Sequence, residues 1–180
     1  MIAVDTSALL AITFQEPERE SFLEAIQRAD RAILSTVTLV EACMVIHGRR
    51  GRGAVLLLDE LLEAPVFEVA PPGLLETELA YAAFAKYGKG TGHPAKLNLG
   101  DLFSYALAKS RGLPLLYKGN DFAATDSVSA LPEAATPSSP QSSQSPASSP
   151  APRPTDPPTP RNRRSPRSAC RAARVRARAR

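Results

Sequence analysis

The chain has 180 residues, and its charge changes sign near residue 131: residues 1–130 carry 12 basic and 16 acidic side chains, whereas residues 131–180 carry 10 and 2. The second segment holds 11 of the 17 prolines and lacks Phe, Tyr, Ile and Met, so we expect one acidic domain over 1–130 followed by a disordered basic tail over 131–180. Two distant cysteines and the lack of a long uncharged apolar run exclude a disulfide-built domain, a cysteine-based metal site and a transmembrane helix, and favour a cytoplasmic protein without membrane contact.

Short apolar runs alternate with helical patterns along residues 1–130. The apolar and β-branched runs predict strands over 2–4, 32–35, 66–69 and 115–117. Apolar residues at helical spacing predict helices over 17–28, 39–47, 72–87 and 102–109. Strands separated by helices favour a three-layer α/β/α domain with a central parallel sheet of four to five strands, in which ligands bind beyond the carboxyl ends of the strands.

Two aspartates follow predicted strands. Asp5 comes directly after the first strand and Asp121 follows the last strand by a short turn, so we expect both carboxylates at the carboxyl edge of the sheet. Each aspartate also has an ordinary explanation, because Asp5 suits a helix N-cap and Asp121 suits a turn after Gly119. Their coincidence with two further acids favours a functional site.

Glu41 shares its predicted helix face with apolar side chains. Its neighbours at helical spacing are Val37, Met44 and Val45. A carboxylate on an apolar stripe must be protonated, paired or bound to a cation. The alternative to a bound cation is a salt bridge to Arg49 or Arg50.

Asp101 opens a nearly all-apolar predicted helix. With Asn98 as the N-cap it fits a capping box, and the helix dipole also keeps such a carboxylate ionised, as a metal ligand must be. Four acids from four elements repel one another unless a cation lies among them. Because no cluster of His or Cys is present, a hard ion such as Mg²⁺ or Mn²⁺ with a phosphate-containing substrate is the chemistry that the sequence favours.

Four strings carry a family resemblance in their order and spacing: IAVDTSALLAI, STVTLVEA, GHPAKLNLGDLFSYALAK and LLYKGNDFAATD. Over residues 1 to about 130 the chain resembles VapC-type toxins of the PIN-domain ribonuclease family. The resemblance implies a PIN-like fold and an Mg²⁺- or Mn²⁺-dependent endoribonuclease, with catalytic residues and metal ligands matching Asp5, Glu41, Asp101 and Asp121. Our mechanistic hypothesis is in-line hydrolysis by a metal-activated water, with Asp5 and Asp101 as the principal ligands.

Substrate contacts are expected from three further groups. The hydroxyl of Thr6 or Ser7 is expected to steady a water or phosphate, and the family pattern places Asp126 as a further acid at the same edge. The glycine-rich loop before Asp101 carries candidate phosphate-binding residues, which are Lys86, Lys89, His93 and Lys96. Ordinary solvated loop charges explain that loop equally well. Arg49, Arg50 and Arg52 at a predicted helix end are candidates for contact with RNA or a partner, and a favourable charge at a helix C-terminus explains them just as well.

The family resemblance also implies partners. These are a small cognate antitoxin that places a basic side chain in the acidic site, an RNA substrate (tRNA, rRNA or mRNA) and a second copy of the chain in a homodimer. An apolar surface for the antitoxin is available on the first two helices if their large apolar residues are exposed rather than part of the core. These residues are Phe14, Phe22, Leu23 and Ile26.

The tail departs from the family pattern. Its Ala, Arg, Pro and Ser content fits either a basic RNA-binding arm or a frameshifted end, and we favour the latter, in which case the final strand is truncated near Ser127. Two other functions stay open, namely a catalytically silent PIN-like module that binds RNA or protein, and a metal-dependent phosphatase or DNA nuclease. Ser7 argues against a phosphatase with an aspartate nucleophile, which has a second Asp at this position.

Overall fold

The protein is seen here as a computed structural model that describes residues 1–131, so from position 132 onward the predicted tail lies outside the described residues. Four parallel strands form one sheet in the order β3-β2-β1-β4. The strands are β1 (Ile2–Val4), β2 (Ala32–Ser35), β3 (Phe67–Ala70) and β4 (Leu115–Leu116). All four predicted strands are confirmed, with ends that differ from the prediction by one residue at β3 and β4.

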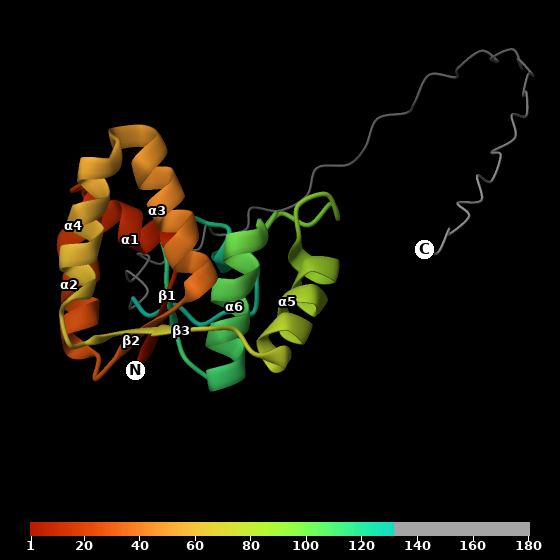
Figure 1. The fold of residues 1–180 in the computed structure, drawn as a ribbon. Helices are drawn as coiled ribbons and strands as arrows, with labels where there is room; N and C mark the ends of the chain where they lie inside the picture. The colour runs from red at the N-terminus through yellow and green to blue at the C-terminus, as the bar shows by residue number, and fades with distance from the viewer. Residues whose placement is uncertain (132–180) are drawn as a thin grey trace, which may run out of the picture. The chain divides into compact units, whose positions relative to one another are not determined.

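Six helices surround the sheet (Figure 1). They are α1 (Thr6–Thr13), α2 (Arg19–Arg28), α3 (Thr36–Arg50), α4 (Arg52–Leu62), α5 (Leu74–Tyr87) and α6 (Leu99–Arg111). The periodicity did not predict α4, and α3 extends beyond the predicted 39–47 because Gly48 does not interrupt it. The chain turns only at Gly51, whose φ of 77° is a left-handed conformation that favours glycine.

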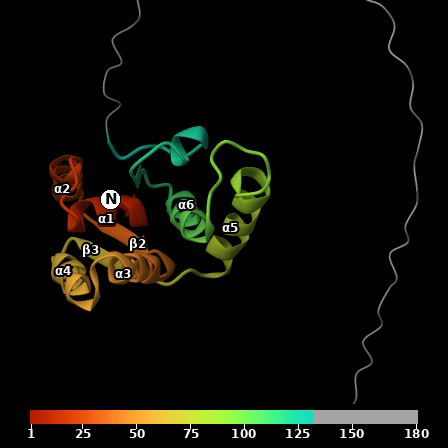
Figure 2. The ribbon, with the colours of Figure 1, turned by 90° about the horizontal axis from the view of Figure 1, so that it is seen from above.

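The strands alternate their side chains between two cores. Ile2 and Val4 of β1 pack with α1 to α4, whereas Ala3 between them packs with α5 and α6. In β2, Ile33 packs in the same core as Ala3, and its neighbour Leu34 packs in the same core as Val4. The sheet is therefore covered on both faces, and the predicted three-layer α/β/α arrangement is confirmed (Figure 2).

The first two helices contribute to the core rather than to an open apolar surface. Phe22 and Ile26 are 1% and 3% exposed, while Phe14 and Leu23 are half-buried against the same cluster. The interpretation of these residues as an exposed docking surface is wrong for Phe22 and Ile26. Large apolar side chains are exposed elsewhere, among them Val40 and Met44 on α3 and Leu99 at the start of α6.

The parallel register brings the carboxyl ends of the strands to one edge. Ala3 pairs with both Ile33 and Leu115, so the residues that follow β1, β2 and β4 emerge side by side. A fifth strand is reduced to a bridge between Leu115 and Ser129, two residues beyond the truncation point expected at Ser127. Within residues 1–131, no helix has both the length and the apolar content to span a bilayer.

Candidate active site

Asp5 is held at the end of β1 by its own role as the N-cap of α1. Its Oδ2 accepts hydrogen bonds from the Ser7 backbone N–H at 2.9 Å and from Ser7 Oγ at 2.6 Å. Asp5 is 2% exposed, and its Oδ1 is buried with no hydrogen-bond partner in the described part of the chain. A buried carboxylate oxygen without a donor is costly, so this atom is suited to a cation.

Glu41 lies beside Asp5 because α1 and α3 both begin at this edge. Thr6 Oγ1 donates a 2.6 Å hydrogen bond to Glu41 Oε2, and the Glu41 carboxylate packs against the backbone of Gly100. The alternative of a salt bridge to Arg49 or Arg50 is wrong, because neither arginine reaches Glu41 in the described ion pairs. Glu41 therefore faces the other acids without a cationic partner.

Asp101 combines both roles that its sequence context allows. Its Oδ2 accepts from the Asn98 N–H at 2.7 Å while Asn98 Oδ1 accepts from the Asp101 N–H at 3.1 Å, which confirms the capping box. Burial, together with the smaller effect of the charges of Asp5, Glu41 and Asp121, outweighs the lowering effect of the Asn98 hydrogen bond and raises the pKa of Asp101 to about 7. The Asp101 carboxylate therefore caps α6 and also experiences the charges of the other three acids.

Asp121 is the exposed member of this group. It follows Gly119, whose φ of 95° makes the turn after β4, and its side chain makes no capping hydrogen bond. Its charge nevertheless contributes to the raised pKa of Asp101. The structure therefore brings together the four acids that the sequence singled out, which we call the acidic rim: Asp5, Glu41, Asp101 and Asp121.

The acidic rim supplies only oxygen ligands, as Mg²⁺ and Mn²⁺ require. Among residues 1–131, no three Asp, Glu, His or Cys side chains already stand close enough to enclose an ion. The acids thus meet as neighbouring charges rather than as a closed cage. Their chemistry and the unpartnered Asp5 Oδ1 fit a hard divalent cation, and the predicted ligand set stays a prediction.

The hydroxyls of Thr6 and Ser7 are already engaged in positioning the acids. Thr6 donates to Glu41, and Ser7 Oγ donates to Asp5 while accepting a 2.9 Å hydrogen bond from the Lys118 N–H. Through this second bond the loop that leads to Asp121 is tied to α1. Both residues therefore act on the acids, and their predicted contact with a water or phosphate stays a prediction.

The glycine-rich loop before α6 presents Lys89 and Lys96 to solvent, and neither takes part in an ion pair among residues 1–131. His93 is fixed differently, with its ring edge-on to Tyr87 at 4.9 Å and its Nδ1 accepting from the Ala95 N–H at 3.2 Å. The two lysines are available for phosphate groups, whereas the His93 ring contributes to the packing of the loop.

Asp126, expected as a further acid at this edge, is bound by side chains of α5 and α6, and its expected place at the rim stays a prediction. Its Oδ1 accepts from Tyr105 Oη at 2.7 Å and from Tyr87 Oη at 3.1 Å, and its Oδ2 pairs with Lys109 Nζ at 3.0 Å. Tyr105 and Lys109 lie about one and two helical turns beyond Asp101 on α6, so Asp126 is held against the middle and the far half of that helix.

Gly100 is a site residue that the sequence patterns did not reveal. A Cβ built at position 100 would overlap the Glu41 carboxylate, so only glycine leaves room for Glu41 at the start of α6. A second tie between the same helices is the 3.0 Å hydrogen bond between the buried hydroxyls of Thr38 and Ser104. The glycine immediately before Asp101 was the available signal, but its meaning depends on a side chain 59 positions earlier.

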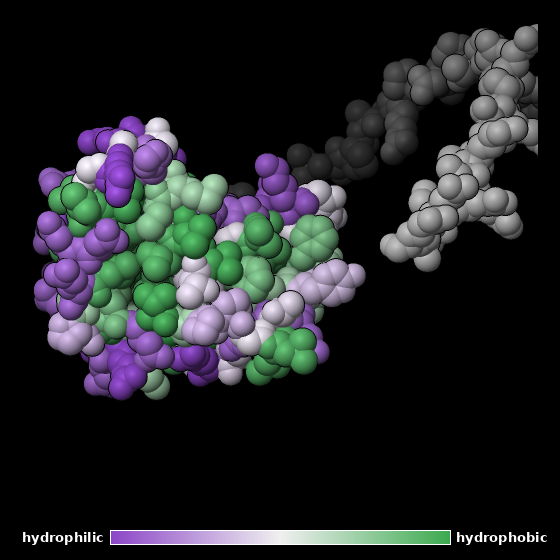
Figure 3. All heavy atoms as spheres, viewed as in Figure 1, coloured by the Kyte–Doolittle hydropathy of each residue, from purple (hydrophilic) through white to green (hydrophobic). Residues whose placement is uncertain are grey.

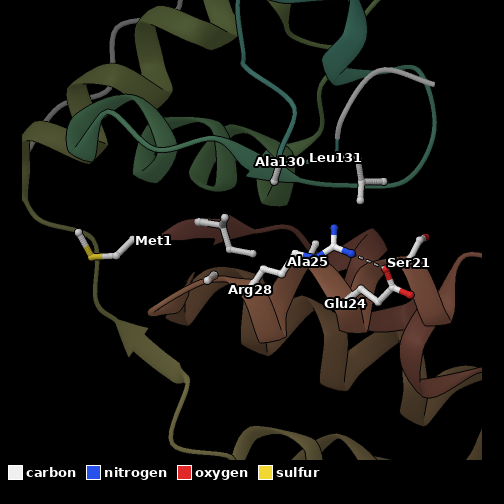
Figure 4. A pocket seen from close by; sticks show the side chains of 9 residues that line it. Met1, Ser21, Glu24, Ala25, Arg28, Ala130 and Leu131 are labelled. Atoms are coloured by element: carbon white, nitrogen blue, oxygen red, sulfur yellow. Dashed lines mark hydrogen bonds and ion pairs between the residues drawn. The ribbon is translucent and has the colours of Figure 1, made fainter. Parts of the chain in front are cut away.

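Two of the hollows among residues 1–131 bear on the position of the site. An open apolar groove of about 740 Å³ runs between α3 and the start of α6, is lined by Val40, Met44 and Leu99, and reaches Glu41. Figure 3 shows the apolar side chains gathered over this face. A second pocket, of about 400 Å³, lies at the amino end of β1, where Arg28 pairs with Glu24 (Figure 4). It is thus at the end of β1 opposite to Asp5.

Comparisons with known proteins place the chain in a family. The profile of the PIN domain matches residues 2–128. The VapC ribonuclease Mb0625 of Mycobacterium bovis is 44% identical over 128 residues, which cover 71% of this chain and 96% of that protein. Ribonuclease VapC42 of Mycobacterium tuberculosis is 40% identical over 123 residues, 68% of this chain and 94% of that one.

Two solved structures share the fold at low sequence identity. The crystal structure of Mycobacterium tuberculosis VapC20, described as a sarcin–ricin loop cleaving toxin, has a TM-score of 0.61 at 18% identity and covers 73% of this chain and 100% of its own. A toxin–antitoxin complex from Klebsiella pneumoniae has a TM-score of 0.54 at 20% identity, with 71% and 95% covered.

Proposed function

Because the chain belongs to the PIN-domain family and is a VapC-type protein, we propose that it is a divalent-metal-dependent endoribonuclease acting as the toxin of a type II toxin–antitoxin pair. The relatives named as ribonucleases match it over nearly their whole length. The observation that carries the proposal is the buried, unpartnered Oδ1 of Asp5 beside an Asp101 whose pKa is raised to about 7. Four carboxylates without a cationic partner are stable together when a cation joins them.

Asp5 and Asp101 would hold the ion, with Glu41 and Asp121 completing the site or orienting a water. When bound, the ion supplies positive charge against the scissile phosphate and lowers the pKa of a water molecule. The protein's own contribution is to fix the carboxylates. Ser7 holds Oδ2 of Asp5, which leaves Oδ1 free to bind.

Two further ligand candidates, Glu41 and Asp101, are also fixed by their surroundings. Thr6 Oγ1 holds the Glu41 carboxylate in place by a hydrogen bond, and the Asn98 N–H together with the amino end of α6 favours the ionised form of Asp101. At Asp101 this effect opposes burial, which favours a proton on the carboxylate. Asp101 is thereby kept ready to exchange a proton for a cation.

RNA is the substrate that the named relatives support, and the exposed Lys89 and Lys96 are our candidates for contacts to its phosphates. The attacking group is water in our proposal rather than a ribose hydroxyl, so the products carry a 5′-phosphate and a 3′-hydroxyl. A 2′,3′-cyclic phosphate among the products would exclude this mechanism.

We assign the groove beside Glu41 to the antitoxin. Val40, Met44 and Leu99 are 57%, 69% and 68% exposed, and a peptide lying along them ends next to the acidic rim, where a basic side chain on that peptide would find four carboxylates. Loss of a copurifying small protein in a Met44→Glu variant would support the assignment, and retention of that protein would contradict it. Homodimerisation stays a prediction from the family.

The decisive experiment is cleavage of a panel of tRNA, rRNA and mRNA fragments by the purified full chain. Each reaction is run with Mg²⁺, with Mn²⁺ and with EDTA, alongside the Asp5→Asn protein, which keeps the shape of the residue and loses its charge. We expect cleavage that needs the metal and is abolished by EDTA and by Asp5→Asn. Binding without cleavage in every metal would instead indicate a silent RNA-binding module.

A further inference from the structure

We propose that Arg49 and Arg50, both held on the ring of Phe14, form a binding site for the phosphate backbone of the RNA strand that is cut at the acidic rim. We call these three residues the arginine shelf. The inference rests on the proposed ribonuclease function and adds to it a contact away from the reacting bond.

The first observation is that the two guanidinium groups are unpaired. Arg49 and Arg50 are exposed and take part in no ion pair among residues 1–131. Four other arginines of the domain each pair with a glutamate, and these are Arg19, Arg28, Arg31 and Arg111. In a domain with more acidic than basic side chains, unpaired guanidinium groups at one place are a local site for an anion.

The second observation is how the guanidinium groups are held. The Cζ atoms of Arg49 and Arg50 lie 5.7 Å and 5.4 Å from the centre of the Phe14 ring. Phe14 is half-buried against the core, so the ring is a fixed platform. A guanidinium stacked on an aromatic ring keeps its N–H groups free at the edge, where they match a phosphate in a bidentate manner.

The third observation is the position of the shelf relative to the rim. Helices α1 and α3 lie side by side: Thr6 at the start of α1 bonds Glu41, whereas Phe14 at its end contacts Arg49 and Arg50. The eight residue steps from Thr6 to Phe14 rise ~12 Å along a helix. A few stacked nucleotides at ~3.4 Å each cover that distance, so one strand reaches both places.

A favourable interaction with the carboxyl end of α3 also stabilises these arginines. That effect is satisfied by either side chain alone and does not require both to share one ring. The shelf instead has the composition of sites that bind nucleic-acid backbones, with cations beside an aromatic surface. Its ligand is therefore a phosphodiester chain rather than a metal or a small apolar molecule.

The test measures the affinity of the full chain for a single-stranded RNA across a range of salt concentrations, in EDTA so that the RNA stays intact. The shelf variant is Arg49→Ala/Arg50→Ala. The matched control is Arg28→Ala/Arg31→Ala, which removes the same charge from two arginines that are already paired with Glu24 and Glu68. The slope of log K against log salt is negative. We expect its magnitude to decrease by ~1.4 in the shelf variant, at ~0.7 per lost phosphate contact, and to stay unchanged in the control.

Two further variants keep the test decisive. Arg49→Lys/Arg50→Lys retains the charge and is expected to keep the slope while weakening binding, because lysine lacks the planar fork. Phe14→Leu keeps an apolar side chain in the core and is expected to weaken binding without changing the unfolding temperature by more than a few degrees. In cleavage assays the shelf variant should raise KM and leave kcat near its original value.

Equal salt slopes in the shelf variant and the control would overturn the proposal, whether both slopes keep their original magnitude or both decrease in magnitude. An unchanged slope together with loss of a copurifying protein would assign the shelf to a protein partner instead. These outcomes are separable from those of the ribonuclease proposal. Cleavage with equal slopes refutes only the shelf, and a reduced slope without any cleavage refutes only the nuclease.

Discussion

Asp101, which belongs to α6, and Asp126, which is bound to side chains of α6, have opposite electrostatic surroundings. At the amino end of α6, burial and then the charges of Asp5, Glu41 and Asp121 raise the pKa of Asp101 to about 7. Beside the far half of α6, burial alone would raise the pKa of Asp126, but hydrogen bonds from Tyr105, Lys109 and Tyr87 outweigh it and lower the pKa to about 2. The residue type is the same, and the neighbours decide its behaviour.

The partners of the two carboxylates indicate which of them stabilises the fold. Asp126 has donors for its oxygens and joins the segment after β4 to α5 and α6, so its charge is satisfied within the protein. The acidic rim gathers like charges and leaves Asp5 Oδ1 without a donor, so its charge is satisfied only by something added. A cluster that destabilises its own fold in this way is typical of a functional site.

The largest expected effect separates the two aspartates by activity. Asp101→Asn should lower kcat by ~10²–10³-fold, because a group that balances charge in the transition state is lost. Asp126→Asn should keep kcat within a few-fold, since its carboxylate is already engaged by Tyr105, Tyr87 and Lys109. Initial rates with saturating RNA and Mg²⁺ measure both. Similar losses in the two variants would contradict the division between a functional and a structural carboxylate.

A smaller effect is expected from Gly100→Ala, which moves an acid without removing it. The new Cβ displaces the Glu41 carboxylate from its hydrogen bond with Thr6, and a misplacement of this size should lower kcat by ~10–100-fold. Gly48→Ala is the control, because that glycine is helical with open space around its Cα, so alanine should preserve activity and slightly favour α3. Full activity of Gly100→Ala would remove Glu41 from the site.

The two aspartates should also affect stability in opposite directions. The pKa of Asp126 is lowered on folding, so its contribution is present above pH ~4 and is lost as the pH falls toward 2. The pKa of Asp101 is raised on folding, so the unfolded chain releases that proton first and stability falls as the pH rises from about 4 to about 7.

Urea unfolding at pH 8 without divalent metal checks these signs. We expect Asp101→Asn to raise the free energy of unfolding by ~1 kcal/mol, as is common when a strained functional charge is removed. Asp126→Asn should lower it by only ~1 kcal/mol, because the Asp126 side chain is 56% exposed and solvent screens its interactions. The comparison fails if both substitutions change stability in the same direction.

The smallest expected effect concerns neither aspartate. Deleting residues 134–180 should leave the unfolding temperature and the kcat for RNA cleavage unchanged, because the acidic rim and both cores are complete within residues 1–131. Thermal unfolding and cleavage rates of the shortened and full chains measure this. A large loss of cleavage would show that the basic tail is an essential arm.

Local sequence patterns predicted the strands, most of the helices and the four acids that the structure brings to one edge. Runs such as Ile2–Val4 carry their strand signal locally, and Asp5 and Asp101 stand at helix starts that local capping rules recognise. Helix α4 was missed because its sequence opens with a continuous apolar run from Ala54 to Leu58, which does not by itself indicate a helix, although Leu58, Leu61 and Leu62 lie on the face that packs against the core.

Only the tertiary structure decided which role each charged residue takes. Asp126 is bound by two tyrosines and a lysine, Gly100 leaves the space for Glu41, and Arg49 lies over the Phe14 ring instead of pairing with Glu41. Each of these depends on contacts between residues 21 to 59 positions apart, and no local pattern encodes them. The physical reason is that burial and neighbouring charge, which set the behaviour of a carboxylate, arise only when the layers pack together.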